Sequence, residues 1–216
     1  MNKITEIGFL IYPNVTQLDA TGPAQVLGRL PGANIHMIWK TLEPVPTDAG
    51  FSLLPNATLE SCPRLDVICV PGGLGQAALM QDPEILDFLK QHGQQARYVT
   101  SVCSGSLLLG AAGLLAGYQS ACHWAYRDML PAFGAIPVAK RVVRDRNRIS
   151  GGGVTAGIDF GLTLAAELAG EDVAKEIQLM LEYNPEPPFD AGTPEKAGPE
   201  LADKIRMQFS QALATQ

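Results

Sequence analysis

The sequence predicts an α/β fold with a mostly parallel sheet and helices on both faces. Three observations support this prediction. Strand-like and helix-like segments alternate along the chain. The segment "LDVICVP" at 65–71 is a continuous apolar run, typical of a strand buried on both faces of a parallel sheet. The chain has 216 residues, 46% of them hydrophobic, which suits one globular domain with a full core.

The first half supplies most of the predicted sheet. We expect strands at 4–12, 34–40, 65–71 and 98–102, and a looser β-like stretch at 44–55. Helices are expected at 21–30, entered through Pro23, from near Gly75, at 83–93, and at 105–116.

The second half adds a hairpin and several helices. A short helix at 123–134 ends at a glycine, and a hairpin at 141–150 turns around Asp145–Asn147. Helices follow at 154–170, after the glycines 151–153, and at 171–183. Residues 184–200 are a Pro/Gly-rich extended arm, and 201–213 form a terminal helix. The interpretation is one α/β domain over 1–183, with 184–216 as an arm and terminal helix.

Composition excludes several classes of function. A net charge of -6 without a basic run argues against binding nucleic acid or an anionic membrane surface. No apolar segment approaches the roughly 20 residues that span a bilayer, and no signal peptide is recognised, so a cytoplasmic protein is expected. The four cysteines have no metal-type spacing, so no metal is expected and the thiols should be free.

Three loops are predicted to meet at one edge of the sheet, because ligands of parallel α/β sheets bind beyond the carboxyl ends of the strands. They are the loop Pro13–Gly22, the "PGG" at 71–73, and the turn that holds Cys103. This convergence makes the edge the candidate site.

Cys103 lies in "YVTSVCSGS", where a strand turns into a helix. That is the geometry of a nucleophile elbow, and the helix N-terminus is expected to favour the thiolate. Gly72 and Gly73 are placed to offer backbone N–H groups to a developing anion. The alternative is that Cys103 fills the core, since free cysteines are often buried.

Two further residues are candidates. Asp19 is either the N-cap of the helix at 21–30 or an acid and base that reaches the thiol, with its pKa raised beside it. His123 is favoured as a capping or supporting residue over a catalytic base. Cys122, beside it, is not assigned a role.

The segments "GFLIYPNVTQLDATGP", "LDVICVPGG", "YVTSVCSGSLLLGAAGLL", "HWAY", "RVVRDRN" and "GGGVTAGIDFGLTLA" together resemble the ThiJ/PfpI superfamily across nearly the whole chain. Within it, the sequence is most similar to the isonitrile (isocyanide) hydratases. Asp19 stands where the deglycase-like branch carries glutamate, and Ser104 stands where the protease-like branch carries histidine. Ser104 also replaces the threonine expected in hydratases, which keeps a hydroxyl and a backbone N–H.

The resemblance implies a flavodoxin-like three-layer sandwich that forms a homodimer, with the arm packed on its own domain or on the dimer partner. It implies no metal, no organic cofactor, and a small isonitrile as substrate. Cys103 would attack the isonitrile carbon and Asp19 would act as general acid and base. Backbone N–H groups of Gly73 and Ser104 would line the site, supported by Gly72 and His123, with Val154 or Thr155 as its far wall.

Two alternatives remain open. One is a glyoxalase or deglycase that acts on 2-oxoaldehydes. The other is a non-catalytic redox or ligand sensor, in which Cys103 could be oxidised. A DNA-binding transcription regulator is not expected, because it would need further helix-turn-helix units of basic character.

Overall fold

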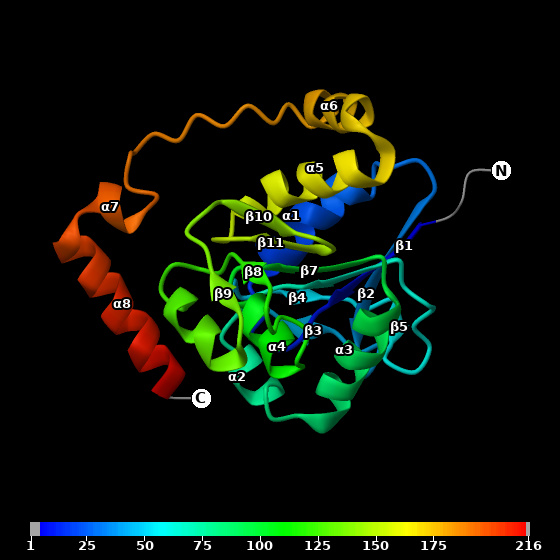
Figure 1. Ribbon diagram of the computed structural model, residues 1–216, viewed down its shortest axis with the longest axis horizontal. Coiled ribbons are helices and arrows are strands. Elements are labelled where there is room, and N and C mark those ends of the chain that lie inside the picture. The colour runs from blue at the N-terminus through cyan, green and yellow to red at the C-terminus, as the bar shows by residue number, and fades with distance from the viewer. Residues whose placement is uncertain (1–4, 215–216) are drawn as a thin grey trace.

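A seven-stranded sheet forms the centre of the computed structural model, which describes residues 5–214 (Figure 1). The strand order is β10-β11-β7-β6-β1-β2-β5, and all neighbours are parallel except β10 and β11. The strands are β1 (Thr5–Leu10), β2 (Ala33–Trp39), β5 (Ala57–Thr58), β6 (Val67–Val70), β7 (Tyr98–Val102), β10 (Val142–Asp145) and β11 (Arg148–Gly151). The predicted fold class is confirmed.

Helices cover both faces of this sheet, which gives the three layers (Figure 1). On one face lie α1 (Gln17–Leu27), α5 (Ala156–Ala169) and α6 (Glu171–Met180). On the other lie α2 (Gln76–Leu79), α3 (Pro83–Gln95), α4 (Gly105–Ala111) and the 3₁₀ helix η1 (Arg127–Phe133). Each interface buries its own apolar cluster, so the sheet is covered on both sides as its apolar strands require.

The site depends on the order of the three central strands. Neighbours β7, β6 and β1 are parallel, so their carboxyl ends meet at one edge of the sheet. The chain leaves these ends through Cys103, Gly72 and the start of α1. The predicted convergence of three loops at one edge is confirmed.

Several element boundaries differ from the predictions. Helix α1 begins at Gln17, so Pro23 lies inside it instead of at its entry, and Asp19 lies in its first turn instead of at its cap. The predicted helix 105–116 ends at Ala111, and glycines with positive φ at 113 and 117 follow it. The strand predicted from residue 4 begins within the described residues at Thr5.

Short elements complete the body. Strands β3 (Val45–Pro46) and β4 (Ser52–Leu53) form a small hairpin in the predicted looser stretch. Strands β8 (Gln119–Ser120) and β9 (Ile136–Pro137) pair in parallel beside η1. None of the helices in the described part of the chain is long and apolar enough to cross a membrane.

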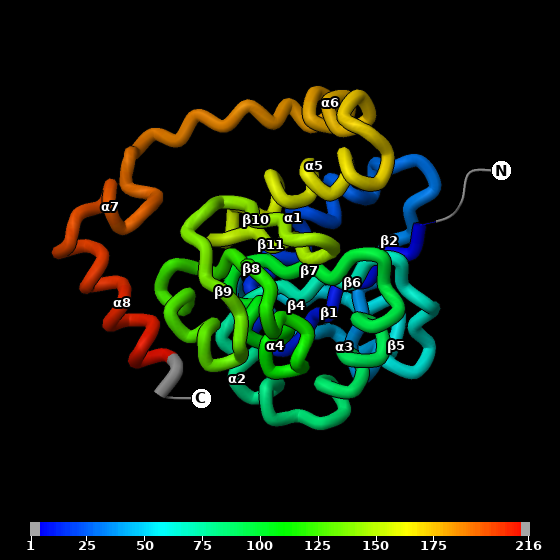
Figure 2. Tube along the Cα trace, in the orientation of Figure 1, coloured from blue at the N-terminus to red at the C-terminus, as the bar shows by residue number. Residues whose placement is uncertain are grey.

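The C-terminal arm leaves the body after α6. Figure 2 shows it as an extended trace that crosses to α7 (Pro194–Ala197), and α8 (Pro199–Ala214) then returns along the outside. The ring of Phe209 on α8 packs edge-on against His123 and Tyr126, with centroids 5.1 and 5.4 Å away. Arg206 on the same helix also lies over the Trp124 ring, 5.4 Å from its centroid, so α8 contacts the body through Phe209 and Arg206.

Candidate active site

The backbone at Cys103 makes a sharp turn between β7 and α4. Cys103 has a φ of 59°, in the left-handed region that costs a residue with a Cβ about 1 kcal/mol. Its N–H donates to the carbonyl of Gly151 at 3.1 Å, which ties the turn to the end of β11. The side chain is only 5% exposed. The nucleophile-elbow geometry predicted from the sequence is present.

Asp19 enters the same corner from the first turn of α1 and is completely buried. Its Oδ2 accepts a hydrogen bond from Gly72 N at 2.9 Å. The other oxygen, Oδ1, has no conventional hydrogen-bond partner among the described residues, and the Cys103 thiol interacts with the carboxyl. The carboxyl is thus anchored by one oxygen and has the other available for chemistry.

Burial raises the pKa of Asp19 to about 7, against smaller lowering effects of the Gly72 N–H and the Cys103 thiol. The sequence predicts a raised pKa here, and the direction is confirmed. At neutral pH this carboxyl therefore exchanges its proton easily, as a group that both accepts and donates protons must.

The pKa of the Cys103 thiol lies well above its usual value, which contradicts the expected preference for thiolate. Burial is the main cause, and the negative charge of Asp19 adds to it. The Ser104 N–H, which donates to the sulfur, opposes both effects but is weaker. The short helix α4 does not overcome the loss of hydration. The resting pair is a thiol beside a carboxyl that titrates near neutrality.

The glycine amides are arranged differently from the expectation. Gly72 N donates to Asp19, and Gly73 N donates to Ser104 Oγ at 3.3 Å, so neither is a free oxyanion donor. Gly73 instead holds the Ser104 hydroxyl in place, while the Ser104 N–H faces the sulfur. A Cβ on Gly72 would lie 2.6 Å from Ser104 Oγ and 2.9 Å from Asp19 Oδ2, so only glycine fits between them.

A pocket of about 500 Å³ lies next to this corner; Cys122, which acts electrostatically on the Cys103 thiol, lines it, whereas Cys103 and Asp19 do not. Val154 and Thr155, the residues expected to form the far wall of the site, line this pocket and follow Gly151, the acceptor for Cys103 N. Val154 packs on the same apolar cluster that contains Cys103. His123 and the arm residues Thr193 and Glu195 line the pocket as well.

His123 is a wall of this pocket and not a partner of the thiol. Its Nδ1 accepts from Ala125 N at 3.3 Å, and its ring packs on Phe209. Burial lowers its pKa to about 4, so the imidazole is neutral at pH 7. This agrees with the capping or supporting role favoured from the sequence.

Residues 5–167 match the family model described as the DJ-1/PfpI family. The chain belongs to the DJ-1/PfpI family. It is 56% identical to an isonitrile hydratase of Pseudomonas putida, over 96% of this chain and 91% of that protein.

This DJ-1/PfpI chain is also similar to two further proteins. A ThiJ/PfpI family protein of Pseudomonas syringae has a crystal structure with a TM-score of 0.95 and 48% identity, covering 98% of this chain and 90% of that one. The HTH-type transcriptional regulator GbdR of Pseudomonas aeruginosa is 32% identical over 82% of this chain, which spans only 50% of the regulator.

Sequence reasoning missed two residues of this DJ-1/PfpI site. The buried Tyr12 hydroxyl donates to the carbonyl of Pro71 at 2.8 Å, linking the loops that carry Asp19 and Gly72. Cys122 lies near enough to Cys103 to raise the pKa of its thiol further. A tyrosine at the end of the first strand was a usable signal for Tyr12, whereas no spacing signal places Cys122. Among residues 5–214, no group of three or more His, Cys, Asp or Glu side chains is placed to hold a metal ion.

Proposed function

We propose that this protein hydrates isonitriles, R–N≡C + H2O → R–NH–CHO, with Cys103 as nucleophile and Asp19 as general acid and base. The observation that carries the proposal is the buried pair itself, a thiol beside a carboxyl whose pKa is raised to about 7. The identity with the Pseudomonas putida isonitrile hydratase supports the choice of substrate.

The first step forms a carbon–sulfur bond. Ionised Asp19 takes the thiol proton as the Cys103 sulfur attacks the terminal carbon of the isonitrile. The carbon then carries a lone pair, and Asp19 returns the proton to it. The product is a thioimidate, R–N=CH–S–Cys103, beside an ionised Asp19. The proton is conserved within the pair, so no separate base is needed.

The second step uses one water molecule. Asp19 takes a proton from the water molecule while the water oxygen adds to the thioimidate carbon. Asp19 then passes that proton to the thioimidate nitrogen. The tetrahedral adduct R–NH–CH(OH)–S–Cys103 then loses its hydroxyl proton to Asp19 as the C–S bond breaks. Asp19 gives that proton to the departing sulfur. The N-substituted formamide leaves and the resting pair is restored.

Ser104 assists both steps through its backbone. Its N–H donates to the Cys103 sulfur, so it stabilises negative charge there when the thiol is deprotonated and when it leaves. The Gly73 N–H keeps the Ser104 side chain in position. Burial of the pair also keeps bulk water away from the thioimidate.

The test is a direct assay of isonitrile consumption and formamide production. Wild type should turn over a neutral alkyl isonitrile, Cys103→Ala should be inactive, and Asp19→Asn should lose at least about 10²-fold in kcat. Cys62→Ser is the matched control, because this half-buried thiol lies outside the site. Turnover that survives Cys103→Ala would refute the mechanism.

The pH profile tests the role of Asp19 separately. The ionised carboxyl is the form that accepts the thiol proton, so kcat/KM should rise with pH and level off above about 7. A profile flat from pH 5 to 9 would contradict this assignment. Consumption of methylglyoxal without isonitrile turnover would favour the glyoxalase or deglycase alternative, and oxidation of Cys103 without either activity would favour the sensor.

We also propose that the protein is a cytoplasmic homodimer and that 184–216 belongs to the same functional unit as 1–183. An apolar depression lined by Leu18, Val26 and Ile158 on α1 and α5 supports a second copy as its cover. Leu179, Met180 and Phe189, on α6 and in the arm, are 82%, 63% and 81% exposed and add apolar surface that a second copy could cover. Sedimentation equilibrium measures the assembly, and a monomer at micromolar concentration would refute it.

A further inference from the structure

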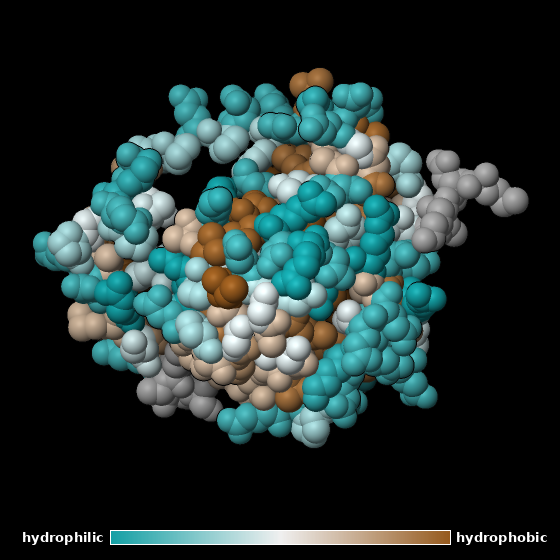
Figure 3. All heavy atoms as spheres, viewed as in Figure 1, coloured by the Kyte–Doolittle hydropathy of each residue, from teal (hydrophilic) through white to brown (hydrophobic). Residues whose placement is uncertain are grey.

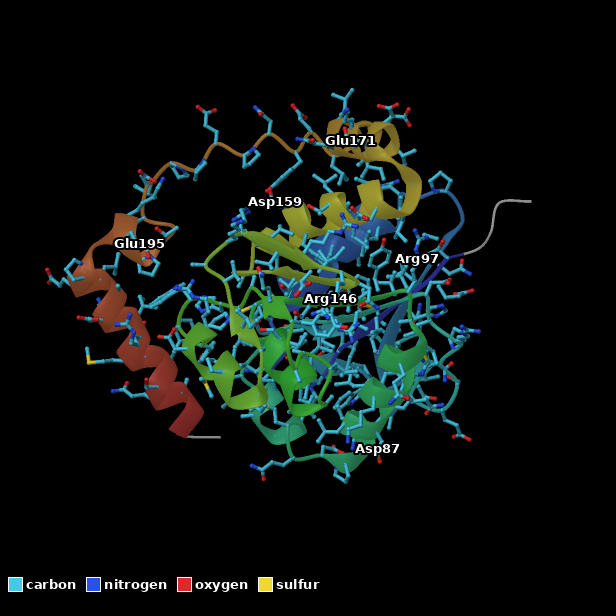
Figure 4. The ribbon with its side chains drawn as sticks, in the orientation of Figure 1. Asp87, Arg97, Arg146, Asp159, Glu171 and Glu195 are labelled. Carbon is cyan, nitrogen blue, oxygen red and sulfur yellow. The ribbon has the colours of Figure 1, made fainter. Side chains whose placement is uncertain are left out.

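The pocket beside Cys103 lies between two parts of the chain. The body supplies residues from the segment that leads into η1, from the segment before β10 and from the segment after β11, and the arm supplies residues of α7 and the turn before it. Figure 4 labels Asp159 on the body and Glu195 on the arm, on opposite sides of this opening. In the space-filling view the arm stands away from the body, and an open gap separates them (Figure 3). Cys103 itself does not line this pocket, but Cys122 does, and Cys122 lies near enough to act electrostatically on the Cys103 thiol.

Charged side chains around the pocket are mostly cationic, although the whole chain has a net charge of -6. Arg127, Lys140 and Arg141 line the pocket, and Glu195 is the one acid in its lining. A local excess of one sign, opposite to the net charge, favours the entry of a ligand of the other sign.

The three cations differ in how far they are already neutralised. Arg141 is paired, with its Nε 2.6 Å from Asp159 Oδ2 and its guanidinium also bonded to Thr155. Arg127 acts on Glu195 at a distance: the pKa of Glu195 is lowered by its own backbone N–H and by Thr193, and slightly by Arg127. Within residues 5–214 no carboxylate lies within 4 Å of Lys140 or Arg127, which leaves both free for a ligand.

The pocket also has apolar walls. Trp124, Ala139 and Val154 line the pocket, and Val154 packs against the cluster that includes Cys103. The pocket next to the Cys103 corner thus combines apolar walls with the positive charge of Lys140. This fits a molecule with a reactive isonitrile at one end and an anionic group at the other.

We propose that this pocket selects isonitriles whose substituent carries an anionic group such as a carboxylate, and that Lys140 and Arg127 bind that group. The inference rests on the proposed function and adds the class of substrate to it. Hydration of such a substrate adds one water to the isonitrile carbon and leaves the anionic group unchanged, so the product is an N-formylamino carboxylate.

Glu195 provides a control within the same pocket, because its charge is opposite to that of Lys140 and its removal should have the opposite effect on the preference for anions. Its carboxylate lines the same pocket and repels an anionic ligand, while Lys140 attracts it. Both side chains are exposed, so each variant is expected to fold. Lys140→Met should weaken the preference for anions and Glu195→Gln should strengthen it.

The experiment compares two substrates of nearly equal size, isocyanoacetate and the neutral isocyanoacetamide. For wild type, kcat/KM should favour the anion about tenfold, the scale of two partly screened charge contacts. Lys140→Met should raise KM for isocyanoacetate several-fold, with kcat and the kinetics of the amide unchanged. Lys90→Met, which removes an exposed lysine of α3, should leave both substrates unaffected. Raising the salt concentration to 0.5 M should reduce the wild-type preference.

The possible failures are distinguishable. Turnover of the amide with no preference for isocyanoacetate would overturn the proposed substrate class and leave the hydratase function standing. A preference unchanged by both Lys140→Met and Glu195→Gln would overturn the assignment to this pocket. Turnover of neither isonitrile would refute the hydratase function and this inference with it.

Discussion

The corner around Cys103 lies next to the pocket that the C-terminal arm lines, but the corner and the arm are held in opposite ways. At the corner, Asp19 is completely buried and glycines leave no room for a Cβ. The arm is mostly exposed, and its terminal helix contacts the body through Phe209 and through Arg206 over Trp124. Chemistry that needs fixed distances lies in the tightly packed corner, whereas the arm adds only one charged group to the pocket, the carboxylate of Glu195, and the cations of the lining belong to the body.

The largest expected effect comes from adding a methyl group to a glycine near Cys103, where the backbone is tightly packed. A Cβ on Gly105 would lie 2.0 Å from the Val70 carbonyl oxygen and 2.7 Å from that of Pro71, so backbone must move. We expect Gly105→Ala to cost more than about 4 kcal/mol in the free energy of unfolding, measured in urea. In the arm, Gly192→Ala meets no atom within 4 Å and should change nothing measurable. Equal effects of the two variants would abolish the contrast.

The buried carboxyl of Asp19 makes the free energy of unfolding depend on pH. The pKa of its carboxyl is about 7 in the folded protein and 3.8 ordinarily, so the folded state binds the proton more tightly. Its contribution to stability is present below pH 4 and is lost as the pH rises to about 7, a total of about 4 kcal/mol. Asp19→Asn retains an oxygen for the Gly72 N–H and should remove this decline. The free energies of unfolding of wild type and Asp19→Asn at pH 4, 6 and 8 measure this decline. An equal decline in both proteins would contradict the prediction.

Phe209 tests whether the arm opens independently of the sheet. Phe209→Ala removes two edge-on ring contacts, so α8 should detach more often, by about 1 kcal/mol of local opening free energy. Hydrogen exchange should accelerate at the amides of α8 but not at those of β7. Met207→Ala, at a side chain 60% exposed on the same helix, is the control. Accelerated exchange in β7 would show that the two regions unfold together.

The smallest expected effect concerns the tyrosine beneath Phe209. The Tyr126 hydroxyl is buried and has no hydrogen-bond partner among the described residues, so Tyr126→Phe should stabilise the protein by about 1 kcal/mol. Tyr12→Phe should do the reverse, because its hydroxyl donates to Pro71. Thermal unfolding of both variants measures the difference. Destabilisation by Tyr126→Phe would mean that its hydroxyl has a partner.

The sequence was most informative where local chemistry decides the structure. The alternating strands and helices, the turn at Cys103 and the approach of Asp19 follow from periodicity and strand order. Proton positions were not predictable, because burial of Cys103 outweighs its helix N-terminus only once the whole corner is assembled. Likewise, the partner of the Gly73 N–H is a side chain 31 residues away, and the arm meets the pocket through long-range packing.

The left-handed backbone at Cys103 also determines which residue types the backbone favours at this position. Glycine adopts that conformation without the cost that any Cβ incurs there, so Cys103→Gly should relieve strain while it removes the sulfur. The backbone alone would therefore be satisfied by glycine, and what a cysteine adds at this position is the sulfur and its chemistry.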